Sequence, residues 1–152
     1  MLIETSPAAD TRPHSGNAAL AVLKRRWPTL VGVVVALALP VATPDASWIG
    51  AVILIAAAVA YPLFGAYRRH LHGRNLLLVQ AISFVAFIAV AVVVLLIDET
   101  VGRYLLAGGF LAHAAWDFAH HRADRMVPRW YAEFCAVVDV LVAVVLVLAP
   151  LL

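Results

Sequence analysis

The stretch from His113 to His121 carries four side chains that are capable of acid–base or metal chemistry. Its sequence is HAAWDFAHH, and the four are His113, Asp117, His120 and His121. At about 100° per residue in a helix, they fall within roughly 100° of one another and form one polar stripe. An imidazole and a carboxylate one helical turn apart can share a proton or a metal ion. The segment therefore predicts a chemical site.

The elements that must position this stripe are strongly apolar. Of the 152 residues, 64% are hydrophobic and 13% are charged, whereas about 25% are charged in an average soluble domain. The apolar residues fall into five blocks, at about 28–43, 48–67, 75–97, 101–121 and 132–152. A helix needs about 20 such residues to cross a bilayer. We therefore predict an all-α polytopic membrane protein, a bundle of five transmembrane helices.

The first block is the shortest, contains Pro40 and follows a basic run, as the apolar core of a signal peptide would. We expect it to be retained as a helix, because no clear small-residue cleavage site follows it. Residues 1–26 contain Pro7 and Pro13 and show no apolar period, so they are predicted to form a flexible cytoplasmic tail. Residues 27–152 are then the transmembrane domain.

The basic residues indicate the orientation. All Lys and Arg residues except Arg103 lie before the first block, between the second and third blocks, or between the fourth and fifth. The positive-inside rule predicts that these regions are cytoplasmic, which leaves the C-terminus outside. Trp27, Tyr67, Trp130 and Tyr131 would mark the cytoplasmic interface. The expected location is the plasma membrane.

Depth in the membrane selects the candidate catalytic residues. His113 lies about 13 Å below the cytoplasmic interface, and Asp139 in the last block lies about 15 Å deep. The two residues are therefore level and are expected to face each other. An ionised carboxylate at such depth costs at least about 2.5 kcal/mol, so Asp117 and Asp139 are candidates for function. We predict a catalytic set of His113, Asp117 and Asp139.

Three interpretations of the polar stripe are open. In the first, His113, Asp117, His120 and His121 supply metal ligands, and imidazole with carboxylate suits Zn or Fe. One helix supplies two or three ligands, so the rest must come from elsewhere; the candidates are Asp139, Glu133, Tyr131, His70 and His72.

The second interpretation needs no metal. His113 would act as a general acid or base oriented by Asp117 or Asp139. Such a pair would suit isomerisation, cyclisation or hydrolysis of a lipid-like substrate that enters from the cytoplasmic leaflet. In the third interpretation, the polar side chains satisfy one another and only tie two helices together.

The segment LLAGGFLAHAAWDFAHHRADRMVPRWYAEFCAVVD, residues 105–139, resembles a family of small, uncharacterised bacterial integral-membrane proteins. The matching pattern is HxxWDxxHH followed by a basic loop, and the resemblance implies a site without naming its chemistry. The sequence HAAWD also looks like a histidine segment of membrane hydrolases of the alkaline ceramidase and progestin-receptor type, which use zinc. Membrane desaturases need more histidine boxes than this chain has.

These observations favour a membrane-embedded enzyme whose partners are membrane lipids and a lipid-like substrate. A small transport or proton-conducting protein and a purely structural membrane protein are the alternatives. The outer half offers almost no polar side chains, which argues against conduction through a monomer. We expect no nucleic-acid partner, and a homo-oligomer remains open.

Overall fold

The computed structural model describes residues 15–42 and 46–148, and every regular element in these ranges is an α-helix. The helices are α1 (Ser15–Ala42), α2 (Ala46–Tyr67), α3 (Arg74–Leu96), α4 (Glu99–Ala123) and α5 (Arg129–Leu148). The prediction of an all-α fold is confirmed for this part of the chain. The bounds of α2, α3 and α4 differ from the predicted ones by at most two residues.

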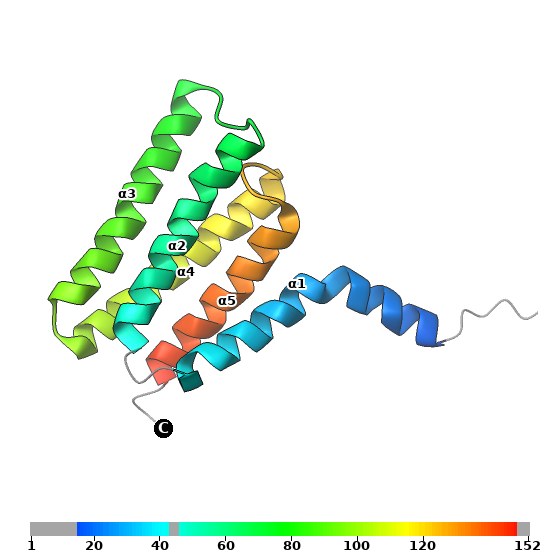
Figure 1. Cartoon of the computed structure of the whole chain (residues 1–152), viewed down its shortest axis with the longest axis horizontal. Coiled ribbons are helices and arrows are strands. Elements are labelled where there is room, and N and C mark those ends of the chain that lie inside the picture. Colours follow the sequence, from blue (N-terminus) through cyan, green and yellow to red (C-terminus); the bar gives the residue numbers. More distant parts are fainter. Residues whose placement is uncertain (1–14, 43–45, 149–152) are drawn as a thin grey trace, which may run out of the picture.

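Helix α1 corrects one prediction, because it begins at Ser15 rather than near residue 28. Residues 15–26 are therefore helical, while predicted tail residues 1–14 lie outside the described ranges. The reason is local: this segment is rich in Ala, Leu, Lys and Arg, which favour helix without any buried face. Figure 1 shows the N-terminal part of α1 turning away from the bundle. Pro28 lies within α1, and a proline inside a helix bends it.

Three helices are long and apolar enough to cross a membrane, over residues Ser47–Tyr67, Arg74–Leu96 and Arg129–Leu148. They are α2, α3 and α5. Their backbone polar groups are satisfied within each helix, which is the requirement of a lipid environment. Helix α4 is less apolar because it contains three histidines and Asp117.

Helix α4 is central to the bundle. It packs most extensively against α5 and also contacts α3 and α2, while α1 packs on the outer side of α5 and α2 packs on α3 (Figure 1). The α2–α3 and α4–α5 connections lie at the same end, which we call the loop end. There, Met126 and Val127 are buried in one cluster with Tyr61, and Leu71 packs against it.

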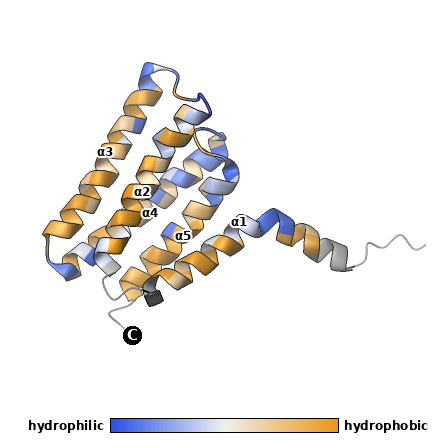
Figure 2. Cartoon of the chain, in the orientation of Figure 1, coloured by the Kyte–Doolittle hydropathy of each residue, from blue (hydrophilic) through white to orange (hydrophobic). Residues whose placement is uncertain are grey.

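Polar and apolar residues are segregated along the bundle. Figure 2 shows that the hydrophilic residues of α4 lie mainly toward the loop end, with a second hydrophilic patch at the α3–α4 turn. Between them, buried Leu54, Leu106, Phe110 and Leu146 belong to one apolar core cluster. The half of the bundle nearer the α3–α4 turn is therefore held by apolar packing.

Close helix approach in that apolar half depends on Gly109. A Cβ atom built there would lie 2.9 Å from Val90 Cγ1 and 3.0 Å from Leu54 Cδ2, so α2 and α3 both press against this glycine. Neighbouring Gly108 meets nothing within 4 Å. Gly109 thus allows two neighbouring helices to approach α4 closely, one turn before His113.

Candidate active site

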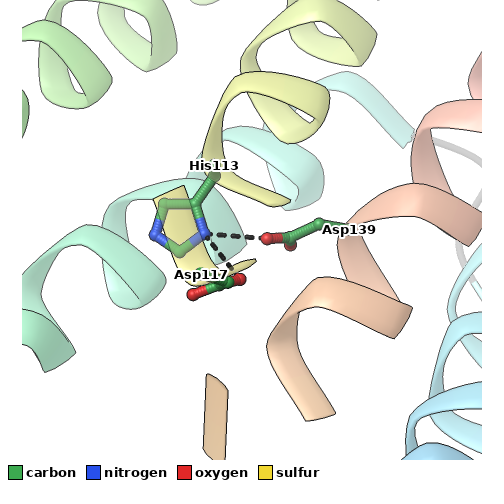
Figure 3. Close-up of side chains that lie close together, drawn as sticks. All are labelled: His113, Asp117 and Asp139. Carbon is green, nitrogen blue, oxygen red and sulfur yellow. Dashed lines mark hydrogen bonds and ion pairs between the residues drawn. The ribbon is translucent and has the colours of Figure 1, made fainter. Parts of the chain in front are cut away.

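His113, Asp117 and Asp139 form one buried cluster at the α4–α5 contact. The Nδ1 atom of His113 lies 2.8 Å from Asp139 Oδ2 and 3.4 Å from Asp117 Oδ2 (Figure 3). The exposed fractions of the three residues are 0%, 0% and 2%. The prediction that His113 and Asp139 face each other across two helices is confirmed.

Local geometry explains how the chain builds the cluster. Asp117 follows His113 by four residues, so both side chains lie on the same face of α4, one turn apart. Asp139 comes from α5, which runs back along α4 after the short connection at the loop end. Helix periodicity thus brings two of the groups together, and helix packing supplies the third.

A fourth member of the cluster, Tyr61 of α2, was not among the predicted site residues. Its hydroxyl donates a hydrogen bond to Asp117 Oδ1, and the side chain is 2% exposed. The sequence does contain a signal, because a tyrosine deep inside an apolar helix needs a partner for its hydroxyl. The sequence does not say which of the other helices supplies that partner.

The two nitrogens of His113 have different surroundings. Nδ1 faces two carboxylates and therefore bears a proton that it donates to Asp139. Nε2 is buried and has no hydrogen-bond partner among the described residues. His113 lines a cavity of about 10 Å³, roughly the space that one water molecule needs. Tyr61, Gln80 and Ser83 also line this cavity. In the neutral imidazole, Nε2 is the proton acceptor.

His120 and His121 were predicted as metal ligands, and neither belongs to the cluster. His120 is buried, but its Nδ1 lies 2.9 Å from the Trp116 carbonyl and its Nε2 lies 2.9 Å from Gln80 Nε2. Both ring nitrogens are therefore engaged in hydrogen bonds. His121 is half-buried and lies outside the cluster. Spacing along α4 placed both on the polar stripe, but His120 contacts Gln80 of α3 instead of α5.

The cluster has a donor set that fits a metal ion. One ligand atom each from His113, Asp117 and Asp139 lie within 4.8 Å of one another. Asp117 Oδ2 is buried and accepts no hydrogen bond from the described residues. One imidazole and two carboxylates suit Zn or Fe. These three residues would supply three ligands and leave a position open, as catalytic zinc sites do.

The other residues considered as ligands lie outside this group. Glu133 accepts a hydrogen bond from the Thr29 hydroxyl and lies 3.5 Å from Arg26 Nη1, so it ties α5 to α1. Tyr131 packs against Phe64. His70 and His72 lie at the loop end, where they line a different hollow.

Asp139 also lines an apolar groove of about 260 Å³ between α1, α2 and α5. Its other walls include Val35, Leu39, Ile53 and Phe134. The buried cluster thus borders two spaces of opposite character. His113 lines a water-sized cavity, and Asp139 lines an apolar groove.

The fold and the cluster define an all-helical protein that has three helices able to span a membrane and a buried His–Asp site at its central helix pair. Comparison of the chain with protein-family models, with curated proteins and with solved structures gives no match.

Proposed function

We propose that the protein is an integral protein of the plasma membrane in which all five helices cross the bilayer, with the N-terminus cytoplasmic and the C-terminus outside. Three apolar helices support the membrane location. Helix α4 has 25 residues, or about 37 Å, which is long enough to cross. Trp27 of α1 and Trp130 of α5 lie 5.5 Å apart and are exposed, as expected of anchors at a shared interface.

We further propose that the protein is a membrane-embedded acid–base enzyme that acts on a lipid-like substrate. One observation carries this proposal: Asp139 is hydrogen-bonded to His113 and also lines the apolar groove. An apolar chain in the groove could reach Asp139, which is the only carboxylate among the described residues that line the groove. Substrate pockets are mostly apolar with a few well-placed polar groups, and this groove fits that description.

In this proposal, Asp139 takes a proton from the substrate and returns it at a second position, which makes the net reaction an isomerisation. The Nδ1–H group of His113 holds the carboxylate in place, and Nε2 exchanges protons with water in the small cavity. Asp117 is a positioning residue that keeps the imidazole ring oriented, and the Tyr61 hydroxyl fixes Asp117. General acid–base catalysis by such groups contributes about 10²- to 10⁴-fold to a rate.

The test uses the full chain in liposomes of a bacterial polar lipid extract, incubated in D₂O. We expect deuterium to enter a lipid at carbon, detected by mass spectrometry. Asp139→Asn and His113→Gln should lower the rate of incorporation by about 10²- to 10⁴-fold. Glu99→Gln, at the exposed start of α4, is the matched control and should leave the rate unchanged. Equal incorporation by Asp139→Asn and wild type would show the proposal to be wrong.

A second candidate is a metal-dependent enzyme on the same residues. It is favoured by the three converging ligand atoms and by the unsatisfied Asp117 Oδ2. A bound Zn or Fe ion would supply a Lewis acid there. Elemental analysis of the purified protein, after repletion with each metal, tests this candidate. Stoichiometric metal should be lost in Asp117→Ala and retained in His121→Ala, which removes an imidazole outside the cluster.

Proton conduction is the less supported alternative. A conduction path needs polar groups along the whole bilayer, whereas the half nearer the α3–α4 turn is filled by an apolar core cluster. Leu54, Leu106 and Phe110 are each 0% exposed in that half.

A further inference from the structure

The loop end contains two hollows, of about 630 Å³ and 450 Å³, that share His72, Leu76 and Arg125 as lining residues. We call them together the basic cleft. One wall comes from the α2–α3 connection and the start of α3, and the other comes from the end of α4 and the loop that follows. The charged or titratable residues that line the cleft are Arg69, His70, His72, Arg74, Asp124 and Arg125.

The positive charge of the basic cleft is not neutralised within the described chain. Asp124 is the only carboxylate among the lining residues, and it lies 3.5 Å from Arg129 Nε. Among the described residues, no ion pair joins Arg69, Arg74 or Arg125 to a carboxylate. The cleft therefore presents three uncompensated arginines from two different segments.

Unsatisfied polar atoms also occur at this end of the molecule. Arg68 Nη1 and His70 Nδ1 are buried, and neither has a hydrogen-bond partner among the described residues. Buried polar groups are nearly always paired in folded proteins, so each orphaned atom needs an explanation. Because a guanidinium nitrogen can only donate, the missing partner of Arg68 is an acceptor.

The two walls of the basic cleft are held in a fixed relation to each other. Met126 and Val127 are 0% and 1% exposed and pack with residues of both α2 and the α2–α3 connection. A Cβ atom at Gly65 would lie 3.1 Å from Met126 Sδ and 3.2 Å from Leu71 Cδ2, so the walls meet closely there. A cleft that is formed before binding avoids part of the ordering cost of association.

We propose that the basic cleft binds a phosphate-bearing anion, with arginines from both walls as its partners. Planar guanidinium groups match phosphate oxygens in geometry and charge. Leu76 of the cleft lies one helical turn from Gln80, which lines the cavity at His113. If the anion is the headgroup of the substrate, the substrate is an anionic phospholipid. This assignment of the substrate depends on the proposed function, whereas the anion-binding site itself does not.

The test is isothermal titration of the full chain in non-ionic detergent micelles. The probes are a short-chain phosphatidic acid, diacylglycerol with the same chains, and inorganic phosphate. The variant Arg74→Gln/Arg125→Gln removes one arginine from each wall, and Arg25→Gln/Arg103→Gln removes the same charge outside the cleft. A basic residue contributes about 1 kcal/mol to binding of an anionic lipid surface, so we expect about fivefold weaker binding per cleft arginine and about 30-fold for the pair.

Stronger binding of phosphatidic acid than of inorganic phosphate would assign the anion to a lipid, and equal binding would assign it to free phosphate. Either result supports the site if the cleft variant loses binding and the control variant retains it. Equal losses in both variants, or equal binding of diacylglycerol and phosphatidic acid, would overturn the proposal. His113→Ala should bind phosphatidic acid as tightly as wild type, because His113 does not line the basic cleft. Anion binding and enzyme activity can therefore fail independently of each other.

Discussion

The two halves of the bundle are built from the same four packed helices but are held together by different forces. Near the α3–α4 turn, the buried residues are apolar and helices approach closely at small residues such as Gly109. Toward the loop end, α2, α3, α4 and α5 meet through Tyr61, Gln80, His113 and Asp139. Polar contacts between membrane helices average only about 0.6 kcal/mol, so they are a weak means of holding helices together.

We therefore expect the polar half to contribute less to the stability of the bundle than the apolar half. Apolar side chains would hold the same helices together at a lower cost in free energy, because each buried charge must first be desolvated. A buried group of two carboxylates and one imidazole is therefore an unfavourable choice for stability, which agrees with the proposed role in chemistry.

Breaking the charge cluster one residue at a time should have the largest effect. Asp139→Leu leaves His113 beside a single carboxylate, and removal of one partner from a buried pair costs about 3–5 kcal/mol. Unfolding in mixed micelles of increasing sodium dodecyl sulfate measures the loss in the free energy of unfolding.

Removing the whole cluster should reverse that loss. The combination of Tyr61→Phe, His113→Leu, Asp117→Leu and Asp139→Leu leaves no unpaired polar group, and such replacements are often neutral or stabilising by about 1–4 kcal/mol. If this variant were instead less stable than Asp139→Leu, the cluster would be a structural element and the contrast between the halves would fail.

Removing the Tyr61 hydroxyl should have the next largest effect. Tyr61→Phe deletes the hydrogen bond to Asp117, and hydrogen bonds to charged groups contribute about 1.5–3 kcal/mol. Tyr67→Phe is the matched control because that side chain is 85% exposed. The same unfolding assay measures both variants, and equal stabilities would mean that the hydroxyl does not hold Asp117.

In the apolar half, we expect stability to depend on side-chain volume rather than on side-chain polarity. Gly109→Val would force Val90 and Leu54 aside, and overpacking of this kind costs about 1–3 kcal/mol. Gly108→Val, one residue away, meets open space and should change the stability by less than about 0.5 kcal/mol. Indistinguishable unfolding curves for the two variants would contradict the close approach of α2 and α3 at Gly109.

The hydrogen bond between Gln80 and His120 should have the smallest effect. A double-mutant cycle with Gln80→Leu and His120→Leu isolates the coupling between α3 and α4, which we expect to be about 0.6 kcal/mol. A coupling above about 2 kcal/mol would mean that this contact is a main support of the loop end rather than a minor one.

Much of the fold was predictable because each apolar block carries its own signal. The bounds of α2, α3 and α4 follow from where apolar runs meet residues such as Asp98, which accepts hydrogen bonds from the first backbone amides of α4. The start of α1 was predicted wrongly because hydrophobicity, rather than helix propensity, set the boundary. The side chains of residues 20–26 are exposed, so this part of α1 has no buried apolar face to mark it in the sequence.

The sequence predicted the contacts among His113, Asp117 and Asp139 but not the separation of His120 and His121 from them. Depth along two antiparallel helices placed His113 level with Asp139, and helix periodicity joined His113 to Asp117. Periodicity also placed His120 and His121 on the same stripe, where the structure separates them from the cluster. A stripe about 100° wide can face two neighbours at once, and the sequence does not say where one neighbour ends and the next begins.

Apart from the start of α1, the helices, their apolar surfaces and the pairing of His113 with Asp117 could be predicted, because they depend on residues close together in the chain. The tertiary structure was needed to show that Tyr61 bonds Asp117, that Gln80 engages His120, and that Asp139, which was expected opposite His113, also lines an apolar groove. Those contacts depend on how α2, α3 and α5 rotate and slide against α4. Side-chain packing at positions such as Gly109 and Met126 sets those rotations, and no local pattern records them.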